Sequence, residues 1–194
     1  WVNGGTAQAV LRPDAPAAAG SSRAWTALEV VVLAATCASP LVWAVAAHDV
    51  LPETLRVATK HAGIKKVAVM YGNDDVFTKS GYDAFKKALE TLKIPVTTTE
   101  TFAKGDVDFK AQLTKIKASG ADAIVLSALI AEGAPIMVQA RQLGIDLPFI
   151  GGNGMNSVKV FDLAKDKSDN LWVGSPWALG SQSKENQHFV VAYT

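Results

Sequence analysis

The sequence contains a single cysteine and lacks the residue patterns of most metal and catalytic sites. Cys37 alone cannot form an internal disulfide, and it excludes zinc sites built from several cysteines. None of the three histidines, His48, His61 and His188, has a metal-ligating partner four residues further on. No serine lies in a G-x-S-x-G motif. These absences favour binding over catalysis, and we expect no cofactor and no metal.

The charge of the chain gives no sign of a nucleic-acid partner. Lysine and arginine number 19, aspartate and glutamate number 18, and the net charge is therefore close to zero. A nucleic-acid surface needs a basic patch, often interleaved with aromatic residues, and no such stretch is present in the sequence. We therefore expect no nucleic acid among the partners of this chain.

Residues 1–47 differ in composition from the rest of the chain. They hold three of the five tryptophans, no lysine and no sustained period of a helix or strand. Within them, residues 24–47 carry Glu29 as the one charge and Pro40 as the one proline, and their length suits a membrane span. Three interpretations stay open: out-of-frame sequence joined to a domain, a signal peptide or membrane anchor, and a folded cap. We expect this segment to lie outside the main fold.

From His48 onward, helix and strand patterns alternate. Asp49 is a candidate N-cap with Pro52 in the first helical turn, and later helices show apolar residues on one face, such as Phe85 and Leu89. The patterns predict helices over 49–63, 80–93, 106–120, 132–144, 156–165 and from 184, and strands over 65–71, 94–102, 121–129, 147–152 and 171–177. This alternation predicts an α/β fold, a doubly wound parallel sheet of Rossmann-like type with helices on both faces.

In such a sheet, ligands bind beyond the carboxyl ends of the strands. The rule indicates the loops 72–79, 127–132, 151–156 and 175–180. The stretch "GGNGMNS" after one strand is not a phosphate loop, because it lacks the G-x-x-x-x-G-K-[ST] pattern and has Ser157 in place of a third spaced glycine. Asp74 and Asp75 look like a catalytic pair, but acidic residues ahead of a helix are more often its caps.

Several segments together resemble the type I periplasmic solute-binding proteins that serve ABC importers of branched-chain amino acids. They are "KKVAVMYGNDDVFTKSGYDAFKKALE", "FAKGDVDFKAQLTKIKASGADAIVLSA", "PIMVQARQLG" and "PFIGGNGMNSVKVFDLA". The resemblance begins near Asp49 and leaves out the first 48 residues. It implies a non-enzymatic protein with two α/β lobes that close on a small solute in the cleft, a periplasmic or extracytoplasmic location, and the membrane subunits of an ABC importer as partners. We expect residues 48–194 to form one lobe, the second, within a longer chain.

The resemblance also implies which residues contact the solute. They are Asn73, Phe77, Ser127, Ala128, Leu129, Gly152 and Asn153. Leu129 stands where a tyrosine often packs on the ligand, and Asn153 stands where an acidic residue pairs with the ammonium of an amino acid. The solute implied is therefore amino-acid-like, or a small carboxylate or amide. Two alternatives stay open: Asn153 only adopts a left-handed turn, and Phe77 only packs in the core.

Two other functions fit parts of the sequence. A ligand-sensing receptor domain of the same fold would use residues 24–47 as its membrane anchor. An enzyme on a doubly wound fold would need a cofactor fingerprint, and the sequence contains none.

We expect the chain as printed to bind small solutes weakly or not at all, because one lobe supplies one wall of a cleft. Sites that bind small molecules well bury most of the ligand surface. Calorimetry with amino acids, aromatic acids and amides should give dissociation constants of about 1 mM or weaker. Micromolar binding of any of these solutes would contradict the expectation.

Overall fold

The structure is a computed structural model, and it describes residues 8–9, 40–174, 184, 187, 188 and 191. The strands are β1 (Gln8–Ala9), β2 (Val67–Gly72), β3 (Val96–Phe102), β4 (Ala123–Ser127), β5 (Phe149–Gly151) and β6 (Leu171–Val173). The helices are α1 (Pro40–Ala62), α2 (Val76–Thr91), α3 (Lys110–Ala118), α4 (Ile130–Gln142) and α5 (Lys159–Ala164), with 3-10 turns η1 (Asn153–Met155) and η2 (Lys165–Ser168).

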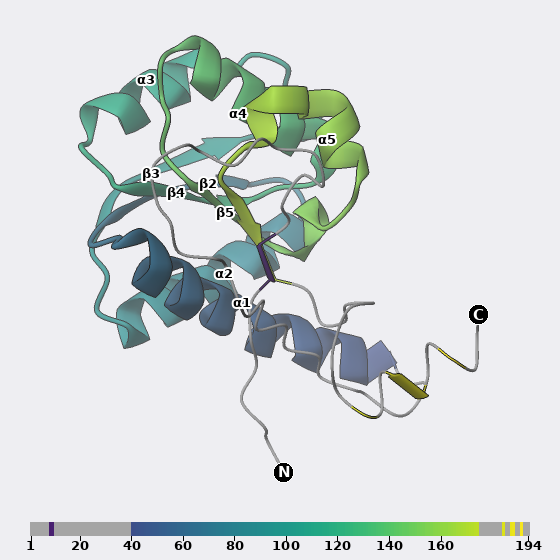
Figure 1. Ribbon diagram of the computed structural model, residues 1–194. Helices are drawn as coiled ribbons and strands as arrows, with labels where there is room; N and C mark the ends of the chain where they lie inside the picture. The colour runs from purple at the N-terminus through teal and green to yellow at the C-terminus, as the bar shows by residue number, and fades with distance from the viewer. Residues whose placement is uncertain (1–7, 10–39, 175–183, 185–186, 189–190, 192–194) are drawn as a thin grey trace, which may run out of the picture.

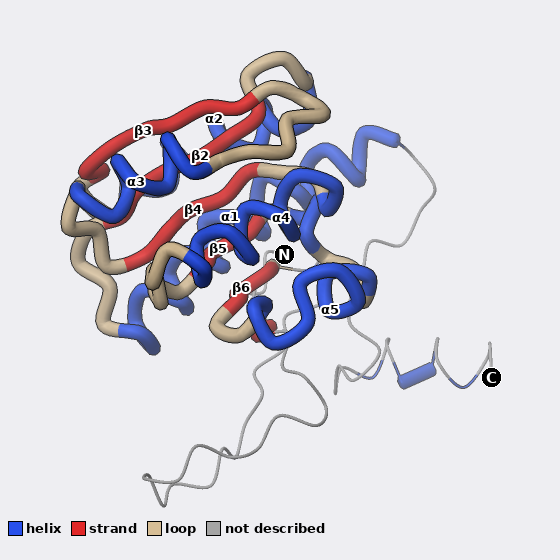
Figure 2. The backbone as a smooth tube through the Cα atoms, turned by 90° about the horizontal axis from the view of Figure 1, so that it is seen from above, coloured by secondary structure: helices blue, strands red, loops and turns tan. Residues whose placement is uncertain are grey.

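The strands form one sheet in the order β1-β6-β5-β4-β2-β3. Strands β2 to β6 are parallel, and β1 pairs antiparallel with β6 at the edge. Helices α1 and α2 cover one face of the sheet, and α3, α4 and α5 cover the other (Figures 1 and 2). The prediction of a doubly wound parallel sheet is confirmed.

The two cores meet along the buried strand β4. All five of its residues are buried. Ala123 and Val125 belong to the core under α1 and α2, whereas Ile124 and Leu126 belong to the core under α3 and α4. A parallel strand that is covered on both faces needs apolar side chains at every position, and this explains why the sequence reads as a continuous apolar run.

Helix α1 differs from the expectation at its start. It begins at Pro40, so Asp49 is not its N-cap and Pro52 lies inside the helix. The stretch from Leu41 to Leu51 contains neither glycine nor proline, so no residue there stops a helix. Gln8–Ala9 pair with β6, and 40–47 form the first two turns of α1. The expectation that residues 1–47 lie outside the main fold stays a prediction. The origin of the segment stays a prediction.

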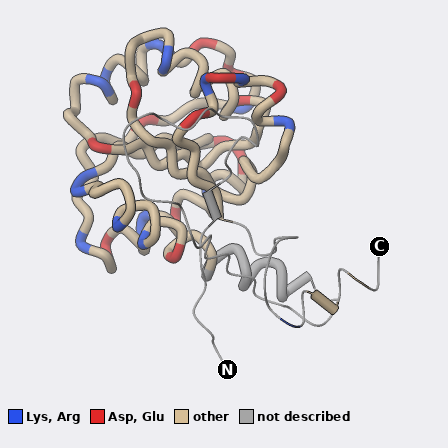
Figure 3. The backbone as a smooth tube through the Cα atoms, viewed as in Figure 1, with Lys and Arg blue, Asp and Glu red and all other residues tan. Residues whose placement is uncertain are grey.

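Most of the predicted membrane anchor, residues 24–39, lies outside the described residues. Of the helices in the part of the chain that the structure describes, none combines the length and the apolar character that a membrane crossing needs. Lysine, arginine, aspartate and glutamate are interspersed over the helices and loops (Figure 3), in line with the near-zero net charge.

Arg141, in the last turn of α4, fastens the chain on either side of β5. Its guanidinium donates to the carbonyls of Ile145 (2.6 Å), Leu147 (2.9 Å) and Asp169 (2.8 Å), and it lies 5.3 Å from the centre of the Phe149 ring. Burial lowers the pKa of Arg141, while the charges of Asp146 and Asp169 act in the opposite direction.

We expect Arg141→Met to destabilise the fold by about 2–3 kcal/mol, because several carbonyls lose a charged donor. Arg141→Lys should recover only part of this loss, because an ammonium cannot reproduce the planar fork of the guanidinium. Urea unfolding measures both changes. Lys87→Met, on the exposed side of α2, is the control and should stay within about 0.5 kcal/mol of the original chain. Equal effects at the two positions would contradict the prediction.

Candidate functional site

The direction of the chain across the sheet reverses between β2 and β4, which are neighbours. From β2 the chain crosses outward to the edge strand β3, and from there it returns past β2 to β4 and continues to β5 and β6. The loops after β2 and β4 therefore leave the sheet toward opposite faces, and in sheets of this kind the crevice that binds ligands is expected between them, at the carboxyl ends of the strands. Most of the predicted site residues lie in these two loops or at the helix starts that follow them.

The loop after β2 carries Asn73 and leads directly into α2. Helix α2 begins at Val76, four residues earlier than the sequence predicts, because Asp75 caps it: its carboxylate accepts the Thr78 N–H at 2.9 Å. The prediction of a helix cap is thus confirmed for Asp75 but is wrong for Asp74, whose carboxylate accepts the Lys104 N–H instead. Phe77 lies in the first turn of α2 with 49% of its surface exposed, and this exposure excludes ordinary core packing. Asn73 is exposed as well.

Ser127 ends β4 and is buried. Its hydroxyl donates to the Thr78 carbonyl at 2.7 Å, and a Cβ at Gly81 would collide with this hydroxyl. The residue thus anchors the start of α2 against the central strand. A ligand contact of Ser127 stays a prediction, whereas its structural bond is a finding that sequence patterns do not reveal.

The turn after β5 brings all three loops together. A Cβ at Gly154 would lie 2.6 Å from the Ala128 carbonyl oxygen, 3.1 Å from Cε1 of Phe77 and 3.2 Å from Cδ2 of Leu129. Segments far apart in sequence therefore meet at Gly154, as the prediction of a joint site requires.

The glycines of this turn are not explained by their backbone conformation. None of Gly151, Gly152 and Gly154 has a positive φ, so a left-handed turn does not explain them. At Gly154, the lack of a side chain lets the protein's own Ala128 carbonyl approach. Gly152, with φ −75° and ψ 177°, would place a Cβ 3.6 Å from Phe85, an ordinary contact.

Asn153 is half-buried and begins the 3-10 turn η1. Its φ is not positive, so a left-handed conformation does not explain this asparagine. Within the described residues its carbonyl accepts the Asn156 N–H at 3.0 Å, and its side-chain amide has no hydrogen-bond partner. The amide is therefore available as both donor and acceptor.

The carboxylates around the crevice are engaged with backbone N–H groups. Asp75 caps α2, Asp74 accepts the Lys104 N–H, and the buried Glu132 in the first turn of α4 accepts the Gly105 N–H at 3.0 Å. Among the residues that the structure describes, no group of three acidic, histidine or cysteine side chains could hold a metal ion. The sequence patterns do not reveal the roles of Glu132 and Gly154. For Glu132 there is one signal, an acidic residue at the third position of a helix that follows an apolar strand.

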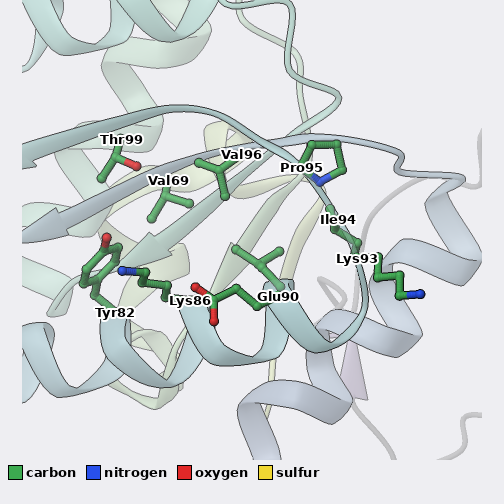
Figure 4. A pocket seen from close by; sticks show the side chains of 10 residues that line it. Val69, Tyr82, Lys86, Glu90, Lys93, Ile94, Pro95, Val96 and Thr99 are labelled. Atoms are coloured by element: carbon green, nitrogen blue, oxygen red, sulfur yellow. The ribbon is translucent and has the colours of Figure 1, made fainter.

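A separate groove of about 470 Å³ lies between α2 and the edge strand β3 (Figure 4). Its lining includes Val69, Tyr82, Leu89, Pro95 and Val96. It opens beside the start of β3, away from the carboxyl ends of the strands, and it contains none of the predicted site residues.

Gly154→Ala should destabilise the fold by about 1–3 kcal/mol, because the new methyl group meets a backbone carbonyl that cannot easily move. Gly152→Ala is the matched control, and its stability should change by less than about 1 kcal/mol. Thermal and urea unfolding of both variants measure the difference. If Gly154→Ala is as well tolerated as Gly152→Ala, the three loops do not pack as described.

Comparison with known proteins identifies the family. A family model described as periplasmic binding protein matches residues 1–194, including the segment 1–47. An amino acid binding protein of Pseudomonas aeruginosa is 33% identical over 91 residues, which are 47% of this chain and 24% of that protein. A leucine-, isoleucine-, valine-, threonine- and alanine-binding protein of the same organism is 29% identical over 108 residues, 56% of this chain and 29% of that protein.

A solved structure agrees with these relatives. It is the branched-chain amino acid transporter substrate-binding protein of Streptococcus pneumoniae in complex with isoleucine, with 30% identity and a TM-score of 0.64. The similarity covers 75% of this chain and 41% of that one, so the chain spans less than half the length of the relatives it matches. The chain belongs to the periplasmic binding protein family and has the type I fold of its structural relatives.

Proposed function

We propose that this chain is part of an extracytoplasmic solute-binding protein that delivers a small amino-acid-like solute, or a related carboxylate or amide, to an ABC importer. The observation that carries the proposal is the meeting of three loops at the carboxyl end of the sheet. There Phe77, Leu129 and the 152–154 turn lie together at the point where the strand order reverses. The family and the relatives, which are named as amino-acid-binding proteins, support the same role.

The side chains at this junction suit the uncharged part of a solute. Phe77 and Leu129 offer apolar surface, and Phe77 is half exposed. Asn153 offers an amide without a partner among the described residues. Asp74, Asp75 and Glu132 are already bonded to backbone N–H groups. We therefore assign the apolar pair to an aliphatic or aromatic group of the solute and Asn153 to a carboxylate or amide at its polar end.

The proposed mechanism is closure of two lobes around the solute. The described sheet supplies one wall of the cleft, and a second lobe supplies the other. Solute that contacts both walls stabilises the closed form, and the importer membrane subunits distinguish the closed form from the open one. Catalysis has no part in this cycle.

Asn153→Asp should change the class of solute that binds. A carboxylate at this position would make a charge-assisted hydrogen bond to an ammonium group and would repel a simple carboxylate. We expect isoleucine to bind about tenfold more tightly and 3-methylpentanoate, which lacks the ammonium, about tenfold more weakly. Chemical-shift titration of the isotope-labelled chain measures both affinities even when they are in the millimolar range.

Asn170→Asp is the control for this experiment. Asn170 is exposed just before β6, at the opposite end of the strands, and it receives the same change in charge. It should leave both affinities unchanged. If neither solute responds to Asn153→Asp, Asn153 belongs to the turn alone and has no part in binding.

A further inference from the structure

Three successive backbone N–H groups in the loop after β3 are each held by a carboxylate. The Ala103 N–H donates to Asp106 at 2.8 Å, and the Lys104 N–H donates to both oxygens of Asp74, at 2.9 and 3.1 Å. The Gly105 N–H donates to Glu132 at 3.0 Å. We call residues 103–105 together with these three carboxylates the carboxylate clamp.

The clamp joins three parts of the molecule that are distant in sequence. Asp74 belongs to the loop between β2 and α2, three residues before Phe77. Glu132 belongs to the first turn of α4, three residues after Leu129, and only 5% of its surface is exposed. Asp106 lies within the loop after β3 itself. Two of the three carboxylates therefore come from the elements that carry the apolar pair of the candidate site.

The geometry of the clamp is restrictive. Gly105 has a φ of 86°, a conformation that strains other residues. A glycine at this position therefore lets the loop direct its three N–H groups toward the carboxylates. Glu132 is buried, and a buried carboxylate that loses its donor is costly. The loop after β3 also forms two hydrogen bonds with Gln139 of α4. The amide of Gln139 donates to the Val107 carbonyl and accepts the Phe109 N–H, each at 2.8 Å.

We propose that Asp74 and Glu132 are positioning residues of the candidate site. By holding the same loop from two sides, they fix the distance between the start of α2, which carries Phe77, and the start of α4, which follows Leu129. The loop after β3 contributes no predicted solute contact, yet it sets the spacing of the apolar pair. As a statement about solute binding, this inference rests on the proposed function; as a statement about geometry, it can be tested without solute.

The chain offers a matched bridge at the other end of the sheet. Asp122, just before β4, accepts the N–H groups of Lys65 and Lys66 at 3.0 and 3.1 Å. Like Asp74, it joins two loops through carboxylate–backbone hydrogen bonds, but it lies at the amino ends of the strands. Removal of either carboxylate should lower stability, and only the removal of Asp74 should affect the site.

The first measurement is made without solute. Gly154 lies against the Phe77 ring, so its α-proton resonances carry a ring-current shift that reports on the position of Phe77. We expect Asp74→Ala to reduce this shift and Asp74→Asn to restore most of it, because one amide oxygen can still accept the Lys104 N–H. Glu132→Ala should reduce the same shift. Because Glu132 is far from Phe77 in the sequence, such a reduction would be transmitted through the loop after β3. Asp122→Ala should leave it unchanged.

The second measurement is the affinity for isoleucine by chemical-shift titration. Asp74→Ala and Glu132→Ala should weaken binding about three- to tenfold relative to Asp122→Ala, with Asp74→Asn close to the original chain. If the Gly154 shift is the same in all variants, the clamp does not position the site and the proposal is overturned. If the shift responds but the isoleucine affinity is the same in all variants, the proposed solute contact at this junction fails while the positioning role of the clamp stands.

Discussion

Burial of strand β4 on both faces is the constraint on which the rest of the structure depends. Its side chains alternate between the core under α1 and α2 and the core under α3 and α4. Such a strand can exist only if helices cover both faces, and right-handed crossovers then require the chain to reverse direction beside it. The reversal between β2 and β4 brings Phe77, at the start of α2, and Leu129, in the loop after β4, to the same end of the sheet. The position of the candidate site thus follows from the way the core is built.

At the edge of this core, polar groups hold the loops in place before any solute is considered. Ser127 ties the end of β4 to the start of α2 through the Thr78 carbonyl. Asp74 and Glu132 tie the starts of α2 and α4 to the loop after β3. Most of the hydrogen-bonding capacity around the crevice therefore serves positioning. Asn153 is an exception. Its side chain is half-buried, and its amide has no hydrogen-bond partner within the described residues.

Periodicity and chain order were sufficient to predict the α/β class, the parallel sheet and the edge at which the site lies. These features depend on apolar patterns such as residues 121–129, which are local and strong. The start of α2 was predicted four residues late, because the side chain of Asp75 and not the apolar pattern sets it. The start of α1 was predicted at Asp49, although the helix extends back to Pro40.

The roles of individual residues were harder to predict, because they depend on contacts between distant segments. Position 154 needs a glycine because the carbonyl of Ala128, 26 residues earlier in the chain, lies against it. The hydroxyl of Ser127 donates a hydrogen bond to the carbonyl of Thr78. Neither contact leaves a local signal in the sequence. The sequence leaves two roles open for Phe77, core packing and solute contact, and its exposure excludes the core.

The central claim is that a solute contacts the junction of the three loops. Intermolecular nuclear Overhauser effects between isoleucine and the labelled chain, recorded at solute concentrations high enough to saturate weak binding, test it most directly. The account predicts contacts from the solute methyl groups to the Phe77 ring and the Leu129 methyl groups, and a contact from the solute to the Asn153 side-chain amide. Contacts confined to Val69, Leu89 and Val96 in the groove between α2 and β3 would contradict it.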